Sequence, residues 1–200
     1  MKNSLTLSLV AALLAIGSAS AQTTGSEVQR NVDQQQRIEN GLQSGQLSTK
    51  EASQLEKGEQ KVDRMEANAN KNGGPTAQQA AAIQKAQNRE SNAIYRDKHN
   101  AVAGNPGSAS SKRMQADVQR NVNQQTRIEN GVKSGQLTNQ ETGKLERGQA
   151  HVNGAEARAG ANGHVGAGEQ KSIQARENRQ SRHVHNKKHN GNGSATGQNG

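Results

Sequence analysis

The chain has 200 residues and a formal net charge of +9, with one Tyr and no Phe, Trp or Cys. The absence of cysteine excludes disulfide bonds and thiol chemistry. Leu, Ile and Val make up 20 of the 179 residues from Gln22 to Gly200, about 11%, whereas chains below roughly 20% tend toward disorder. This composition argues against the dense core of an enzyme and predicts partial disorder.

The first residues have the layout of a secretory signal peptide. Lys2 precedes a mostly apolar run from Leu5 to Ile16, and small residues lead to Ala19-Ser20-Ala21, an A-x-A cleavage site. The run is shorter than the roughly 20 residues that a membrane-spanning helix needs. We therefore expect cleavage after Ala21, no membrane span in the mature protein, and a periplasmic or secreted location.

The remainder of the chain is an internal repeat. Residues Val28–Asn100 align with Val118–Asn190 at a shift of 90 residues without a gap, and 35 of the 73 aligned positions are identical. A repeat of this kind is the structural unit of the fold. We therefore interpret the mature chain as one helical unit written twice.

The first repeat begins with a predicted helix and a turn. Apolar residues on one side of a 100° helical wheel predict a helix over 28–42, which ends at the Gln-Ser-Gly of 43–45. Ser48 stands three residues before Glu51, the spacing of a capping box, and an apolar stripe continues to Met65. A second helix is expected from this cap.

The third predicted helix follows a chain break. Asn-Gly-Gly-Pro at 72–75 ends the second helix, because proline does not continue one. Thr76 and Gln79 repeat the cap spacing and start a helix that includes Ile83 and Ile94.

The second repeat keeps these signals, with Thr138 and Glu141 as its clearest cap. It adds glycines, which weaken helices and predict a looser second copy. These glycines are Gly143, Gly154, Gly160, Gly166 and Gly168.

The predicted fold is all-α, with two tandem three-helix units, a flexible linker and partial disorder. Its segments are a signal peptide (1–21), helical repeat unit 1 (22–100), the linker (101–115), the basic helical repeat unit 2 (116–190) and a disordered C-terminal tail (191–200).

Two turns resemble degenerate calcium-binding EF-hand loops, Asn40–Glu51 and Asn130–Glu141. Glycine stands at their sixth position and glutamate at their twelfth. Calcium also needs oxygen ligands at the third position, where Leu42 and Val132 stand, so a helix-turn-helix joint is the favoured interpretation. Divalent-metal binding stays an alternative function, here or at a C-terminal cluster of His183, His185 and His189, where i, i+4 spacing suits a weakly held metal.

Positive charge concentrates in the second repeat. Residues 22–110 hold 11 basic and 10 acidic side chains, whereas residues 111–200 hold 14 and 7. A basic segment near the C-terminus is the leading candidate for anion binding, as contact with lipopolysaccharide or another anionic envelope polymer. Its basic residues are Lys171, Arg176, Arg179, Arg182, Lys187 and Lys188. With Tyr95 as the single aromatic residue, no platform for specific nucleic-acid readout is expected.

No motif in the sequence points to catalysis or to a cofactor, so we expect a non-enzymatic protein. Glu56, Glu59 and Glu66 stand at helical spacing among lysines and are expected to form surface ion pairs.

The segments Gln36–Gly41 and Ile94–Asn100, with the Ser-Gly-Gln-Leu turn between them, carry a family resemblance. The chain resembles uncharacterised exported proteobacterial proteins that share a QRIxxGxxSGxLTxxE segment followed by YxxKHN. The resemblance covers both repeats and implies export without indicating an activity. The chain departs from the pattern where His183-Val184-His185 replaces the tyrosine segment.

Overall fold

The computed structural model describes residues 10–191, with side chains described for residues 23–191. The described residues form six α-helices and no strand, which confirms the predicted all-α class. The helices are α1 (Val10–Ser44), α2 (Thr49–Asn70), α3 (Ala77–Lys98), α4 (Ala109–Lys133), α5 (Asn139–Ala159) and α6 (Ala167–Lys188), with a short 3-10 helix, η1 (Gly160–Asn162), before α6.

The helix starts follow the predicted caps. Ser48, Thr76 and Thr138 each accept a hydrogen bond from the backbone N–H three residues later, and the side chain at that later position accepts one from the cap backbone. Gly45 and Gly135 stand in the two Ser-Gly-Gln-Leu turns with φ of 76° and 70°, where a side chain is strained. Local sequence therefore sets these boundaries.

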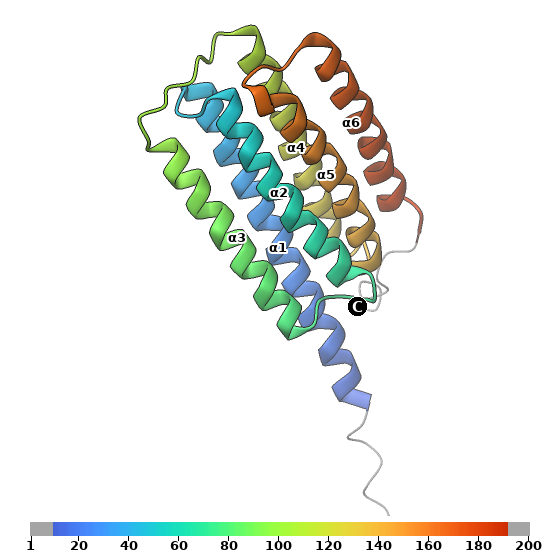
Figure 1. The fold of residues 1–200 in the computed structure, drawn as a ribbon. Helices are drawn as coiled ribbons and strands as arrows, with labels where there is room; N and C mark the ends of the chain where they lie inside the picture. The colour runs from blue at the N-terminus through green and yellow to red at the C-terminus, as the bar shows by residue number, and fades with distance from the viewer. Residues whose placement is uncertain (1–9, 192–200) are drawn as a thin grey trace, which may run out of the picture.

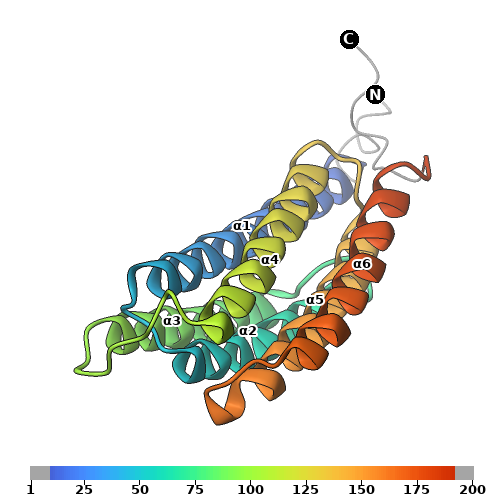
Figure 2. The same ribbon diagram turned by 90° about the horizontal axis from the view of Figure 1, so that it is seen from above.

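The six helices form one bundle in which the two repeats interlock. α2 packs along α5 and α1 along α4, while α3 covers α1 and α2 on one side and α6 covers α4 and α5 on the other (Figure 1, Figure 2). α2 and α5 are antiparallel, because Gly160 lies against Thr49 and Ser53, whereas Gly143 lies against Asn70. The contact between Ser53 and Gly160 therefore recurs, between the equivalent residues of the two repeats, as the contact between Gly143 and Asn70.

The predicted terminal segments are only partly described. Residues 1–9 of the expected signal peptide and residues 192–200 of the expected tail lie outside the described part of the chain. Residues 10–21 belong to the first turns of α1, which project beyond the rest of the bundle (Figure 1). Within residues 10–191 no helix is both long and apolar enough to span a membrane.

The expected linker, residues 101–115, is partly helical, because α4 already begins at Ala109. The Ser108 hydroxyl accepts a hydrogen bond from the Ser111 N–H (3.1 Å), and Met114 is fully buried. Before α4 the chain lies against the α1–α2 turn, where the Gly104 N–H donates to the Gly45 carbonyl at 2.8 Å. A capping serine and a buried methionine thus start the helix earlier than composition indicated.

Polar side chains complete the interior where apolar residues are scarce. The largest apolar cluster joins both repeats, with Leu55, Ile94, Met114 and Ile173 among its members. Buried amides extend this core, and each amide is 3% exposed or less; they are Asn31, Gln34, Gln35, Asn70, Gln87, Asn121, Gln124, Gln125, Gln149, Asn153 and Gln180. All of them except Gln149 form hydrogen bonds to neighbouring helices, and these bonds replace apolar contacts. Composition alone therefore underestimates the order of the described helices.

The glycines of the second repeat permit close packing. α5 is continuous through Gly143 and Gly154, contrary to the loosening that helix propensity predicts. A Cβ at Gly143 would lie 2.9 Å from the Asn70 Cβ and 3.1 Å from the Ala67 carbonyl oxygen on α2. The cost of glycine in α5 is offset by the approach of α2.

Gly143→Ala is expected to lower the free energy of unfolding by about 1–3 kcal/mol, because the new methyl group overlaps the α2 backbone. Urea unfolding followed by circular dichroism measures this. Gly168→Ala is the matched control, since a Cβ there meets nothing within 4 Å, and it is expected to cause no loss. Equal stability of the two variants would contradict glycine-mediated packing of α5 on α2.

Candidate functional site

All six residues of the predicted anion-binding segment lie on α6, but their environments differ. Lys171, Arg179 and Arg182 are exposed, whereas Arg176, Lys187 and Lys188 are partly buried. Lys187 is engaged, because its Nζ lies 3.8 Å from Glu141 Oε1. The structure therefore divides the predicted set and directs attention to the side of α6 that faces α5.

A basic groove runs between α5 and α6. Its main cavity has a volume of about 290 Å³ and is lined by Gly148, His151, Val152, Arg176, Arg179, Gln180 and His183. A neighbouring cavity of about 180 Å³ shares Arg176 and adds Arg158 and Glu169. The buried Nε of Arg176 has no hydrogen-bond partner. We call this feature the α5–α6 groove, and its lining of guanidinium and imidazole groups suits an anion.

The three predicted metal-binding histidines separate in the structure. His183 lines the α5–α6 groove, whereas the rings of His185 and His189 lie 4.4 Å apart at the end of α6. His189 Nδ1 lies 2.7 Å from the His185 carbonyl oxygen, which makes Nδ1 the donor. Tyr95 and His99 form the equivalent ring contact in the first repeat, at 4.2 Å. The paired rings thus recur at the same helix end in both repeats.

The EF-hand-like turns serve as helix caps. Glu51 Oε2 accepts hydrogen bonds from the Ser48 N–H (2.9 Å) and hydroxyl (2.7 Å), and its Oε1 accepts one from the Asn100 amide (2.6 Å). Glu141 makes the same contacts with Thr138 and Asn190. Both carboxylates at the twelfth position are occupied by capping, in agreement with the helix-turn-helix interpretation.

Sequence reasoning missed a line of buried carboxyl groups in the centre of the bundle. The prediction of surface ion pairs for Glu56, Glu59 and Glu66 is wrong, because these residues are 0%, 0% and 1% exposed. These glutamates lie on the side of α2 that packs against α5, so solvent does not reach them. Asp63 on α2 and Glu146 and Glu156 on α5 are equally buried. None of these six groups forms an ion pair within the described chain.

The antiparallel α2–α5 contact arranges four of these carboxyl groups into two related sites. Glu146 and Glu156 stand 90 residues after Glu56 and Glu66. The first site pairs Glu66 with Glu146, and the second pairs Glu56 with Glu156, so each takes one glutamate from each repeat.

Amides from α1 and α4 hold both sites in corresponding ways. At the first site Asn31 donates to Glu66 (2.7 Å) and Gln125 to Glu146 (3.1 Å). At the second site the corresponding contacts are Asn121 to Glu156 (2.7 Å) and Gln35 to Glu56 (3.0 Å). The recurrence at a spacing of 90 residues makes these contacts a property of the repeat.

Burial changes the titration of these groups. Loss of solvent raises the pKa of Glu56 to about 8 and that of Glu146 to about 7, although hydrogen bonds from Gln35 and Gln125 oppose the rise. Burial, followed by the charge of Glu146, raises the pKa of Glu66 well above its usual range. In the absence of a cation these groups therefore retain protons close to neutral pH.

The described residues define an all-helical protein with a basic groove outside and an acidic core inside. No protein-family model, no curated protein and no solved structure matches the chain. The assignment of function therefore depends on the site geometry.

The raised pKa values predict that the metal-free protein is most stable in mild acid. A group whose pKa rises on folding stabilises the folded state below its unfolded pKa, and this contribution disappears as the pH rises through the folded value. Burial also raises the pKa of Glu177 on α6 to about 8. With the pKa of both Glu56 and Glu177 at about 8, we expect Tm in EDTA to fall by roughly 5–10 °C from about pH 5 to about pH 8.5.

Thermal unfolding by circular dichroism measures this dependence. Glu56→Gln is expected to flatten it, although Glu90 and Glu156 still face that position. Asp33→Asn, at an exposed position of α1, is the control and should leave the profile unchanged. A Tm that rises over this pH range would show that the core carboxyl groups are not the dominant titrating groups.

Proposed function

We propose that the chain is a non-enzymatic helical repeat protein, periplasmic or secreted, which associates electrostatically with an anionic envelope component. Its two tandem three-helix units, residues 22–100 and 116–190, share a scaffold and differ in charge. The α5–α6 groove is the observation that carries the proposal. Two arginines and two histidines at one cavity favour phosphate groups, such as those of lipopolysaccharide, over a neutral ligand.

Comparison with the first repeat supports a specialised second repeat. Arg176, Gln180 and His183 of α6 correspond to Ala86, Glu90 and Ala93 of α3. At Gly58 a Cβ would meet the carboxylate of Glu90, whereas at the equivalent Gly148 it would meet the neutral amide of Gln180. The first repeat therefore lacks one arginine and one histidine at this place and carries an acid instead, which disfavours an anion there.

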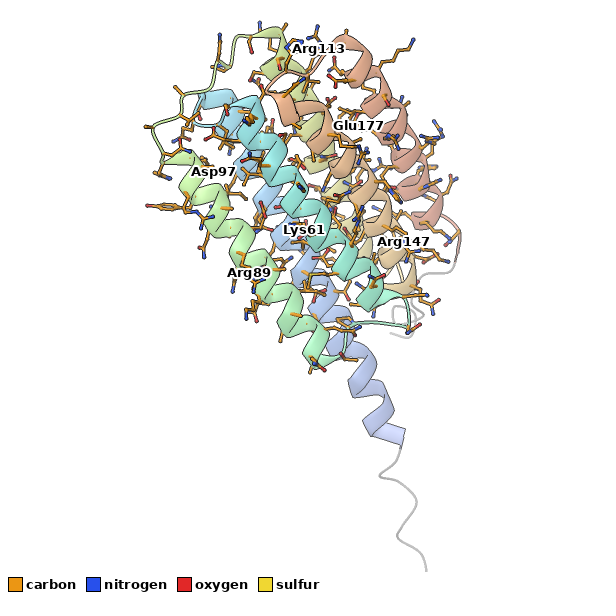
Figure 3. The ribbon with its side chains drawn as sticks, in the orientation of Figure 1. Lys61, Arg89, Asp97, Arg113, Arg147 and Glu177 are labelled. Carbon is orange, nitrogen blue, oxygen red and sulfur yellow. The ribbon has the colours of Figure 1, made fainter. Side chains whose placement is uncertain are left out.

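The groove variant Arg176→Ala/Arg179→Ala is expected to weaken binding to purified lipopolysaccharide at least tenfold at low salt, since charge-assisted contacts to phosphate are lost. Co-sedimentation and calorimetry measure the affinity. Arg89→Ala on α3 (Figure 3) is the matched control, because Arg89 stands 90 residues before Arg179 and is its counterpart in the first repeat. The proposal fails if the wild-type protein does not bind at low salt, or if the groove variant binds as well as the control.

The Gln180→Glu substitution introduces into the α5–α6 groove the glutamate that the first repeat has at the equivalent position, Glu90. The new carboxylate is expected to weaken lipopolysaccharide binding about tenfold, because it would lie beside Arg176 and Arg179. The same titration with dephosphorylated lipopolysaccharide should give weak binding for both proteins. If Gln180→Glu binds as tightly as the wild type, the groove is not the contact surface.

A further inference from the structure

The centre of the bundle contains more hydrogen-bond acceptors than donors. Both oxygens of Glu59, Oδ1 of Asp63 and Oε1 of Glu146 are buried without a hydrogen-bond partner. Each of these carboxylates is fully buried, and no ion pair compensates them within the described residues. Buried charge of one sign needs a proton or a cation for compensation.

A neutral side chain adds to this surplus. Gln125 donates its amide N–H to Glu146, so its head lies at the carboxylates, but its Oε1 has no partner. Carbonyl oxygens, unlike carboxylates, do not gain a partner by taking up a proton at neutral pH. Their presence favours a bound cation over protonation alone.

Three carboxylates converge closely enough to share one ion. Asp63, Glu66 and Glu146 each offer an oxygen, and these oxygens lie within 4.8 Å of one another. Oxygens that ligate one Ca²⁺ at about 2.3–2.6 Å are separated by no more than about 5 Å, so the spacing fits. Within the described residues no other group of at least three acidic, histidine or cysteine side chains meets this condition.

Each of the three carboxylates is held by an amide from another helix. Asn153 donates to Asp63 Oδ2 at 2.9 Å, and Asn31 donates to Glu66 Oε2 at 2.7 Å. Gln125 donates to Glu146 Oε2 at 3.1 Å, which leaves Oε1 available. Hydrogen bonds that orient ligating groups in this way are the usual outer layer of a metal site.

The chemistry of the donors selects the class of ion. The potential ligand atoms are all carboxylate oxygens, and no histidine or cysteine belongs to the cluster. Such a set favours hard cations over Zn²⁺ or Cu²⁺. Mg²⁺ loses its water shell reluctantly, whereas this place is closed to solvent. Ca²⁺ and Mn²⁺ remain as the ions that suit a dry, all-oxygen site.

We propose that Asp63, Glu66 and Glu146 together bind one hard divalent cation, Ca²⁺ or Mn²⁺, in the centre of the bundle. The related Glu56–Glu156 site has Asn153 where this site has Asp63, so it has one carboxylate fewer and binds cations more weakly. This cation site is separate from the α5–α6 groove, and it does not depend on the proposed function.

The test compares ion binding by the wild type and by single-site variants. The protein is stripped with EDTA and then either incubated with Ca²⁺, Mn²⁺, Mg²⁺ or Zn²⁺ or refolded from urea in their presence, because the buried site opens slowly. We expect Ca²⁺ or Mn²⁺ to raise Tm by about 5 °C or more, with one ion per chain by mass spectrometry of the metal content.

The Asp63→Asn variant tests whether Asp63 is a ligand of the cation or has only a structural role. It removes a buried acid without changing the size of the side chain, so Tm without metal should rise at neutral pH while the metal-induced shift disappears. Glu146→Gln is the second variant and should abolish the shift in the same way. Glu156→Gln is the matched control, because it removes the counterpart of Glu66 from the other site, and it should keep the shift.

The possible results distinguish the alternatives. The proposal is overturned if none of the ions binds to or stabilises the wild type after refolding, which would mean that protons alone neutralise the core. It is also overturned if Asp63→Asn keeps the full shift, or if Glu156→Gln loses the shift to the same extent as Glu146→Gln.

Discussion

The close antiparallel packing of α2 on α5 organises the whole bundle. Gly143 lets the α2 backbone approach, because any side chain there would meet Ala67 and Asn70. Since the two helices are antiparallel copies of one repeat, each contact between them recurs between the equivalent residues, as Glu66 with Glu146 and Glu56 with Glu156. A stripe of glutamates that would face solvent on a single helix is thereby enclosed, and each carboxyl pair takes one member from each repeat.

This arrangement makes a polar interior stable where apolar residues are too few. Amides of α1 donate to carboxyl groups of α2, and amides of α4 donate to carboxyl groups of α5. The hydrogen bond from Asn153 to Asp63 joins α5 to α2, so that hydrogen bonds connect the four central helices. Burial keeps the pKa of these acids high, and near neutral pH a proton or a cation must accompany them. The two repeats differ at one decisive position, where Asp63 faces Asn153 and makes the related sites unequal.

Burial of the acids also affects the outer surface. The formal charge of +9 counts every Asp and Glu as negative, but carboxyl groups that stay protonated in the core contribute no charge. The exposed part of the protein is therefore more positive than its composition states. Several basic side chains of α5 and α6, including Arg147 (Figure 3), are exposed on the second repeat, while Glu146, Glu156 and Glu177 of the same helices are buried. The acidic interior and the basic exterior are two consequences of one helix orientation.

Local features were predictable from the residues alone: the all-helical class, the 90-residue repeat, and the helix starts at Ser48, Thr76 and Thr138. Caps and turns depend on residues three or four apart, so a short window contains all the information they need. A signal for the buried core was also present, since Asn31, Glu56 and Glu66 recur unchanged 90 residues later, but the spacing of a polar stripe does not distinguish an exposed face from an enclosed one.

The packing of the helices sets which face of α2 is enclosed, which arginines share a groove, and which carboxylates converge. These features depend on contacts between residues far apart in the chain. The α2–α5 approach that encloses the carboxylates is permitted by the missing side chain at Gly143, although glycine has a low helix propensity.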